Sequence, residues 1–212
     1  GQSALSRNTT ASYNVAIGRE ALYLNTTGAN NSAFGFQALT ANTTGASNTA
    51  VGKDCMDSNT TGARNVAMGV DSLQANTTGT ENTAIGVEAS LTNTTGTDNT
   101  SVGYRALYGN TTGIKNTAIG ASALATNTTG ANNTALGWRA LLANTTGANN
   151  TAVGLSAGDN ITTGSSNIII GASIDAASAT GDNQINIGGI DLRQTTAKAW
   201  CNFNGTGTVA IR

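Results

Sequence analysis

The strongest constraint on this chain is an internal repeat of 17 residues. The tripeptide Asn-Thr-Thr recurs at that step, beginning at Asn8, Asn25, Asn42, Asn59, Asn76, Asn93, Asn110, Asn127 and Asn144. A glycine that ends a short apolar segment keeps the same step, at Gly18, Gly35, Gly52, Gly69, Gly86, Gly103, Gly120, Gly137, Gly154, Gly171 and Gly188. No insertion or deletion interrupts the series. A fixed period of this kind predicts a repeat architecture in which every unit occupies an equivalent place.

Each position within the repeat has its own character. The residue before the glycine is always apolar, the residue two before it is usually Ala, and the residue four before it is Asn in every unit until Gln184 replaces it. An apolar pair follows three and four residues after many of the glycines, Ala-Leu in five units and Cys55-Met56 in another, whereas the two intervening positions vary freely. We therefore predict that the constant positions, including the apolar residue before the glycine, face the interior or shape the backbone. The variable positions should face solvent.

A unit of this length is too short for a helical-pair repeat, and its Thr, Asn and Gly content disfavours helix. Segments such as "NTAIG" are typical of strands, and the glycines and Asn-Thr-Thr-Gly predict tight corners with positive φ and side-chain caps. A short helical turn at the Ala-Leu pair would fit some coils. We predict an all-β fold, a parallel β-solenoid (β-roll or β-helix). Stacking at about 4.8 Å would align Asn with Asn in hydrogen-bonded ladders and give a rod about 50 Å long.

Composition argues against several classes of function. Only 10% of residues are charged, the net charge is −1 and there is no histidine, so neither a nucleic-acid binder nor an enzyme is expected, and no cofactor or metal site. Most carboxylates lie at variable positions that should be solvated: Glu20, Asp54, Asp57, Asp71, Glu81, Glu88 and Asp98. Cys55 takes a position that is Ala in most units, which predicts a small buried residue. No apolar run is long enough to span a membrane.

One column of coils should be only marginally stable. Each coil offers few inward apolar side chains, each stabilising by at most about 1.5–3 kcal/mol, whereas ordering each residue costs about 1–2 kcal/mol. We therefore expect a homotrimeric fibre.

The chain divides into three parts. Residues 1–160 are regular coils, residues 161–190 are variant closing coils that lack Asn-Thr-Thr, and residues 191–212 are predicted to form a β-hairpin around Asn204-Gly205.

Two families share these motifs. "NTAIG", "NTSVG" and "NVAMG" resemble the head repeats of trimeric autotransporter adhesins, which are trimers of parallel β-rolls. The coils followed by "SSNIIIGASIDAASATGDNQINIGG" and "AKAWCNFNGTGTVAIR" more closely resemble tail fibres of marine and cyanobacterial phages, upstream of an endosialidase-type chaperone domain. This resemblance implies a shaft segment of a virion fibre that takes part in host attachment, with other fibre or baseplate proteins as partners. The alternative is an adhesin head on a bacterial cell surface.

Two sets of side chains are candidates for direct binding. Phe36, Tyr104 and Trp138 follow the glycines, with Arg105 and Arg139 beside two of them, so they could stack on a host-surface polysaccharide. The simpler interpretation is that these aromatic residues pack between chains. A column of threonines, Thr26, Thr43, Thr60 and Thr77, would suit ice binding as a third hypothesis, but Thr also suits a strand edge or turn.

Overall fold

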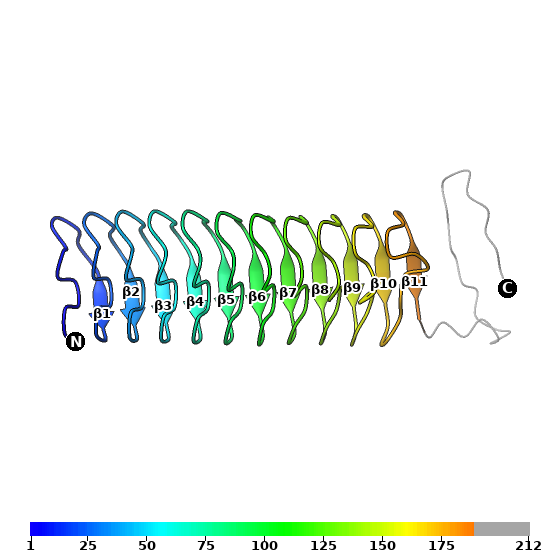
Figure 1. Cartoon of the computed structure of the whole chain (residues 1–212), viewed down its shortest axis with the longest axis horizontal. Coiled ribbons are helices and arrows are strands. Elements are labelled where there is room, and N and C mark those ends of the chain that lie inside the picture. Colours follow the sequence, from blue (N-terminus) through cyan, green and yellow to red (C-terminus); the bar gives the residue numbers. More distant parts are fainter. Residues whose placement is uncertain (189–212) are drawn as a thin grey trace, which may run out of the picture.

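The computed structural model describes residues 1–188 of the chain, which form one parallel sheet of eleven strands stacked in sequence order. Figure 1 shows the coils side by side along a straight rod, with one short strand in each. The strands are β1 (Val15–Ile17), β2 (Ser32–Phe34), β3 (Thr49–Val51), β4 (Val66–Met68), β5 (Thr83–Ile85), β6 (Thr100–Val102), β7 (Thr117–Ile119), β8 (Thr134–Leu136), β9 (Thr151–Val153), β10 (Ile168–Ile170) and β11 (Ile185–Ile187).

The register of the strands confirms that each repeat is one turn of a solenoid. Every residue pairs with its counterpart one repeat later, as Ala50 does with Ala67. Gly52 also lies directly against Gly69, since a Cβ atom on Gly52 would stand 2.6 Å from the Gly69 carbonyl carbon. The predicted variant coils supply β10 and β11 to this stack. The predicted hairpin over residues 191–212 lies outside the described residues.

The wall opposite the strands is formed by a return segment, residues 37–41 in the second coil and their equivalents elsewhere. No helix occurs in residues 1–188, so the expected helical turn is absent there. Left-handed φ values instead occur at alternate residues, such as Gln37 (φ 54°) and Leu39 (φ 53°). The N–H of Gln37 donates to Arg19 O in the preceding coil and that of Leu39 to Cys55 O in the following one, at 2.9 and 3.0 Å. These bonds along the rod offset the strain of left-handed non-glycine residues.

The two glycines of each coil have different roles. The glycine after the strand has the predicted positive φ, 143° at Gly52, where an L side chain would be strained. At Asn-Thr-Thr-Gly the predicted side-chain cap is present, since Asn25 donates to Gly28 O at 2.9 Å, but positive φ was predicted wrongly there, because Gly28 and its equivalents do not have it. Glycine is needed there for space: a Cβ atom on Gly28 would lie 2.8 Å from Asn25 Oδ1 and 2.9 Å from Asn42 Nδ2. The corner's left-handed residue is instead the second after that glycine, Asn30 in this coil (φ 62°).

The interior is thin and consists mainly of Ala from the strands and Ala-Leu from the return segments. It divides into two apolar clusters, spanning Ala21–Ala89 and Ala106–Ala176. Between them Ser90 replaces Leu and Ser101 replaces Ala, and their buried hydroxyls hydrogen-bond at 2.9 Å. The apolar core is thus interrupted by a polar pair whose members satisfy each other.

One prediction about side-chain direction was wrong. The apolar residue before the glycine points outward: Ile17 is 59% exposed, Leu136 46% and Met68 43%. Alternate residues of a strand face opposite sides, so the inward Ala of "TAI" forces the Thr and Ile on either side of it to face outward. We call this outer side, formed by the first and third residues of β1–β11, the outer face of the sheet.

Candidate functional site

The Asn-Thr-Thr asparagines form the predicted ladder along the inside of the rod. The Asn42 amide donates to Asn25 Oδ1 in the coil before it (2.8 Å) and to Gly45 O in its own turn (2.9 Å). The same bonds recur along the series to Asn144, and the ladder residues from Asn25 onward are fully buried. Buried amides need such partners, because an unpaired polar group in an apolar interior is costly.

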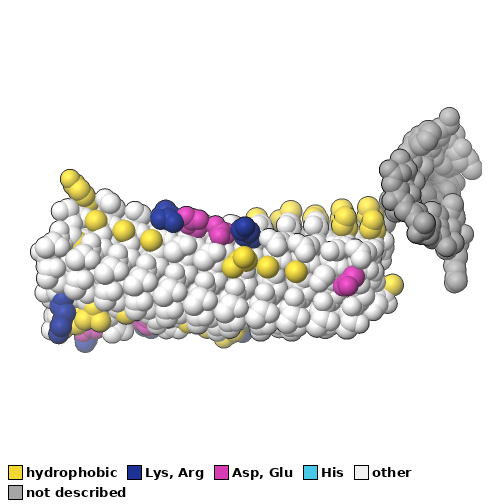
Figure 2. Space-filling view, turned by 90° about the horizontal axis from the view of Figure 1, so that it is seen from above, with side chains coloured by type: hydrophobic (Ala, Val, Ile, Leu, Met, Phe, Trp, Pro, Cys, Tyr) yellow, Lys and Arg dark blue, Asp and Glu magenta, His cyan; other side chains and the backbone are white. Residues whose placement is uncertain are grey.

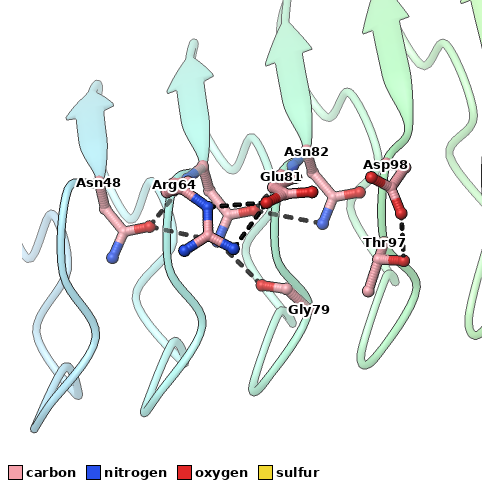
Figure 3. Close-up of polar contacts among 8 residues, drawn as sticks. Asn48, Arg64, Gly79, Glu81, Asn82, Thr97 and Asp98 are labelled. Carbon is pink, nitrogen blue, oxygen red and sulfur yellow. Dashed lines mark hydrogen bonds and ion pairs between the residues drawn. The ribbon is translucent and has the colours of Figure 1, made fainter.

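A second ladder runs beside the first strand residues. Asn65 donates its backbone N–H and its side-chain amide to Asn48 Oδ1, at 3.0 and 3.2 Å, and the same amide reaches Gly79 O at 2.9 Å. Figure 3 shows Asn48 and Asn82 in this ladder, with Gly79 below them. The ladder continues to Asn167, where Gln184 takes over both bonds to Asn167 Oδ1. Each coil is therefore tied to the next by side chains as well as by the sheet.

The first ladder ends at Asn144 because the next position is Ile161. Asn144 Oδ1 is buried and has no hydrogen-bond partner. Two other changes accompany Ile161: Gly158 replaces Leu and Ile169 replaces Ala. A Cβ atom on Gly158 would lie 3.2 Å from Ile169 and 3.3 Å from Ile161, so the two isoleucines fill the space that a leucine takes in other coils. The core volume is conserved at the cost of one unsatisfied carbonyl.

Charged side chains also form a row along the rod. Arg64, Glu81, Asp98 and Lys115 occupy one position in four successive coils. Arg64 pairs with Glu81 at 2.6 Å, and Figure 3 shows Asp98 one coil further on, hydrogen-bonded to Thr97. The Thr97 hydroxyl, which donates a hydrogen bond to the Asp98 carboxylate, lowers the pKa of Asp98. Figure 2 shows a short row of basic and acidic side chains along one edge of the rod. Exposed pairs of this kind contribute little to stability.

The outer face of the sheet carries two parallel files of side chains. The first is mostly Thr or Val, and the second is entirely apolar: Ile17, Phe34, Val51, Met68, Ile85, Val102, Ile119, Leu136, Val153, Ile170 and Ile187. Most members of the second file are at least one-third exposed. Soluble monomers rarely expose a continuous apolar strip of this length.

The predicted sugar-contact residues lie one step beyond this face, on the turn after the glycine. Phe36, Tyr104 and Trp138 are all exposed, at 37%, 50% and 48%. Arg105 lies over the rings of Tyr104 and Tyr108, with its carbon Cζ 5.2 and 5.1 Å from their centroids. Arg139 lies 5.0 Å over the ring of Trp138. Tyr104, Arg105, Trp138 and Arg139 belong to nearby coils, whereas Phe36 lies four coils away from Tyr104 and is paired with Arg19.

Tyr108 was not among the predicted residues. It lies in the return segment, three residues after Arg105, and its ring is a second aromatic contact of that guanidinium. The spacing alone carried no signal, because the contact depends on the left-handed backbone at Arg105 (φ 54°).

The threonine column predicted for ice binding uses its hydroxyl protons within the rod. Thr26, Thr43 and Thr60 each donate to the carbonyl of the next threonine, at 3.0, 3.1 and 3.0 Å. Their side chains are half-buried in the turn. The hydroxyls therefore do not present free donors to an outside lattice, which argues against ice binding.

The predicted burial of Cys55 is confirmed: the side chain is fully buried, and burial raises its pKa to about 12. Asp57 is half-buried, and this burial, together with Asp54 and Asp71 nearby, raises its pKa. Within residues 1–188, no three side chains of the His, Cys, Asp and Glu types are placed to hold a metal ion together.

No protein family, curated protein or solved structure matches this chain. Across the described part of the chain there is also no helix with the length and apolarity to cross a membrane. The class that the fold defines is a parallel β-solenoid with two internal asparagine ladders.

Proposed function

We propose that this chain is a structural shaft segment of a homotrimeric phage tail fibre that takes part in host attachment. The observation that carries the proposal is the apolar file on the outer face of the sheet, which runs the length of an uninterrupted rod. The resemblance of the coils to tail-fibre and adhesin repeats supplies the class of assembly.

The rod is built to hold its length. Strand pairing and the second asparagine ladder bind each coil to the next, the first ladder adds further bonds up to Asn144, and the pairing has no insertion or bulge between β1 and β11. A stack of this kind extends by about 4.8 Å per coil, so the number of repeats sets the distance between its ends. Length set by repeat number is the property that a spacer requires.

The outer face of the sheet supplies the surface for association. Its second file is apolar in all eleven strands although the inside of the rod does not need it. Burying such side chains stabilises by about 25 cal/mol per Å² of apolar area. Three parallel chains in register would bring equal levels of this file together around one axis, because every coil has the same height.

A charged substitution on this face tests the association. Leu136 is exposed in one chain, so Leu136→Asp should leave the fold intact, yet it would place three carboxylates close together in the trimer. We expect this variant to sediment as a monomer with an unchanged circular dichroism spectrum. Thr129→Asp, on the exposed turn before β8, is the matched control and should remain a trimer. Equal sedimentation of both variants with wild type would refute the proposed surface.

The location of the protein tests the fibre itself. Antibodies raised against the rod should label tail fibres on virions in immunogold electron microscopy. Labelling of the bacterial cell surface instead would replace the fibre with the second candidate, a trimeric adhesin head. The exposed aromatic and Arg residues after the glycines favour that candidate, because an adhesin binds through its own surface.

A further inference from the structure

A second surface of the rod has the features of a ligand site. It lies on the turns that contain Tyr104, Ala121 and Trp138, which occupy the same position in three successive coils. Two exposed aromatic rings therefore stand about 10 Å apart along the axis, separated by a small alanine. We call this surface the aromatic notch: Tyr104, Ala121 and Trp138, with Arg105, Ser122 and Arg139 next to them.

The notch is held rigidly. Ser122 N–H donates to Tyr104 O at 2.9 Å, and Arg139 N–H donates to Ala121 O at 3.0 Å. These bonds fix the three turns relative to one another without using any side chain of the notch. A ligand would therefore meet rings whose spacing is already set, which lowers the entropy lost on binding.

The two arginines of the notch differ in whether a carboxylate already pairs with them. Arg105 uses its Nε to bind Glu88 at 2.6 Å, and that bond raises its pKa. Arg139 forms no ion pair with any of residues 1–188 and lies over the Trp138 ring. A guanidinium on an aromatic face keeps its edge N–H groups for an anion, and carboxylates match that edge with two parallel hydrogen bonds.

The coils that carry the notch have an excess of positive charge, with Glu88, the partner of Arg105, one coil below. Between Asp98 and Asp159 the sequence contains Arg105, Lys115 and Arg139 but no Asp or Glu. Among the charged residues from Asp54 to Asp98 only Arg64 is basic, so the excess positive charge is confined to the coils around the notch. Such a region attracts an extended anion in a manner that depends on salt.

We propose that the aromatic notch binds a carboxylated oligosaccharide that lies along the rod. Sugar rings would stack on Tyr104 and Trp138, whose flat faces suit the apolar faces of pyranose rings, and their carboxylates would pair with Arg139 and Arg105. The site lies on the turns after the corner glycines and not on the first and third strand residues that form the outer face of the sheet. It therefore remains open when chains associate through that face.

Trp138 provides the assay. The chain contains only two tryptophans, so Trp200→Phe leaves an emission that reports on Trp138 alone. A hexasaccharide that alternates glucuronate with N-acetylglucosamine should change this emission saturably, and less so as salt rises. Neutral maltohexaose and a glutamate hexapeptide should bind at least about tenfold more weakly, because one lacks charge and the other lacks sugar faces.

Substitutions test whether the hexasaccharide binds at the notch or elsewhere on the surface. Ala121→Phe should fill the notch and weaken hexasaccharide binding at least about tenfold, and Arg139→Gln should weaken it similarly. Ala172→Phe places the same side chain at the equivalent exposed position away from the notch, and should bind like wild type. Neither substitution adds a tryptophan, so the emission still reports on Trp138. Three results would overturn the proposal: no saturable change at millimolar hexasaccharide, equal binding of either control ligand, or equal binding by Ala121→Phe and Ala172→Phe. The mass of the assembly is independent of these results, so failure here leaves the fibre proposal intact.

Discussion

Replacing one ladder asparagine by aspartate tests how the coils are held together. Asn93 is in the middle of the rod and almost fully buried. Its amide donates to Asn76 Oδ1 at 2.9 Å and to Gly96 O at 3.1 Å, and its own Oδ1 accepts from the Asn110 amide at 2.8 Å. Asn93→Asp keeps the acceptor and removes both donors.

The expected loss of stability follows from the hydrogen-bond partners that Asn93→Asp leaves unsatisfied. Gly96 O still accepts from Asn82 at 2.9 Å, but Asn76 Oδ1 loses its partner and faces a carboxylate oxygen. One unsatisfied buried acceptor costs about 1–3 kcal/mol, and an uncompensated buried charge costs about 3–5 kcal/mol. We therefore expect Asn93→Asp to lower the free energy of unfolding by about 3–5 kcal/mol at neutral pH.

The pH dependence of stability distinguishes the effect of the buried negative charge from the effect of the lost amide group. Burial should raise the pKa of the new carboxyl above about 3.9, the value for an unfolded Asp. The folded variant then binds more protons than the unfolded one above about pH 4, so its stability relative to wild type should fall as the pH rises. Below that pH the neutral acid can donate one hydrogen bond, and part of the loss should be recovered.

Urea unfolding followed by far-ultraviolet circular dichroism measures both effects. Asn132→Asp is the control, because Asn132 lies on the exposed turn and its side chain has no hydrogen bond within the described residues. We expect that control to change stability by less than about 0.5 kcal/mol. If Asn93→Asp were equally mild at neutral pH, or independent of pH, the ladder would not stabilise the stack as argued.

Three further predictions follow from particular residues. In a Cys201→Ser background, Cys55 should react with Ellman's reagent only as fast as the rod opens, because its pKa of about 12 keeps the buried thiol protonated. Rapid labelling of the folded protein would contradict the burial of Cys55. Ser47→Gly should stabilise by about 0.5 kcal/mol in urea unfolding, because Ser47 is left-handed (φ 59°), whereas Ser32→Gly in β2 should destabilise. Since burial raises the pKa of Asp57, wild type should lose stability relative to Asp57→Asn as the pH rises above about 4. If the urea unfolding midpoints of the two proteins changed equally with pH, this prediction would be refuted.

Much of the fold follows from the period of the sequence. A constant step gives the coil, the β-branched "NTAIG" segment gives the strand, and the asparagine columns give the ladders, because stacking repeats the same side chain at each level. The direction of the residue before the glycine was predicted wrongly although the sequence contains the signal. In "NTAIG" the buried Asn and Ala alternate with Thr and Ile, and this two-residue alternation places Ile outside.

Other features could not be predicted, because no residue type indicates the backbone geometry on which they depend. Leu39 and Gln37 adopt left-handed φ, which their side chains disfavour, because the backbone must reach the neighbouring coils. The Ser90–Ser101 pair becomes visible only when the two walls of the rod are brought together. For the aromatic residues, the positions of Tyr104 and Trp138 after the glycines could be predicted, but the contact of Tyr108 with Arg105 could not.

The most direct test of the account is the native mass of the chain in solution, measured by light scattering over a range of protein concentrations. Association through the apolar outer face of the sheet predicts three times the 21.1 kDa mass of one chain, about 63 kDa. A particle of 21.1 kDa at every concentration would contradict it, since the exposed apolar file would then have no partner.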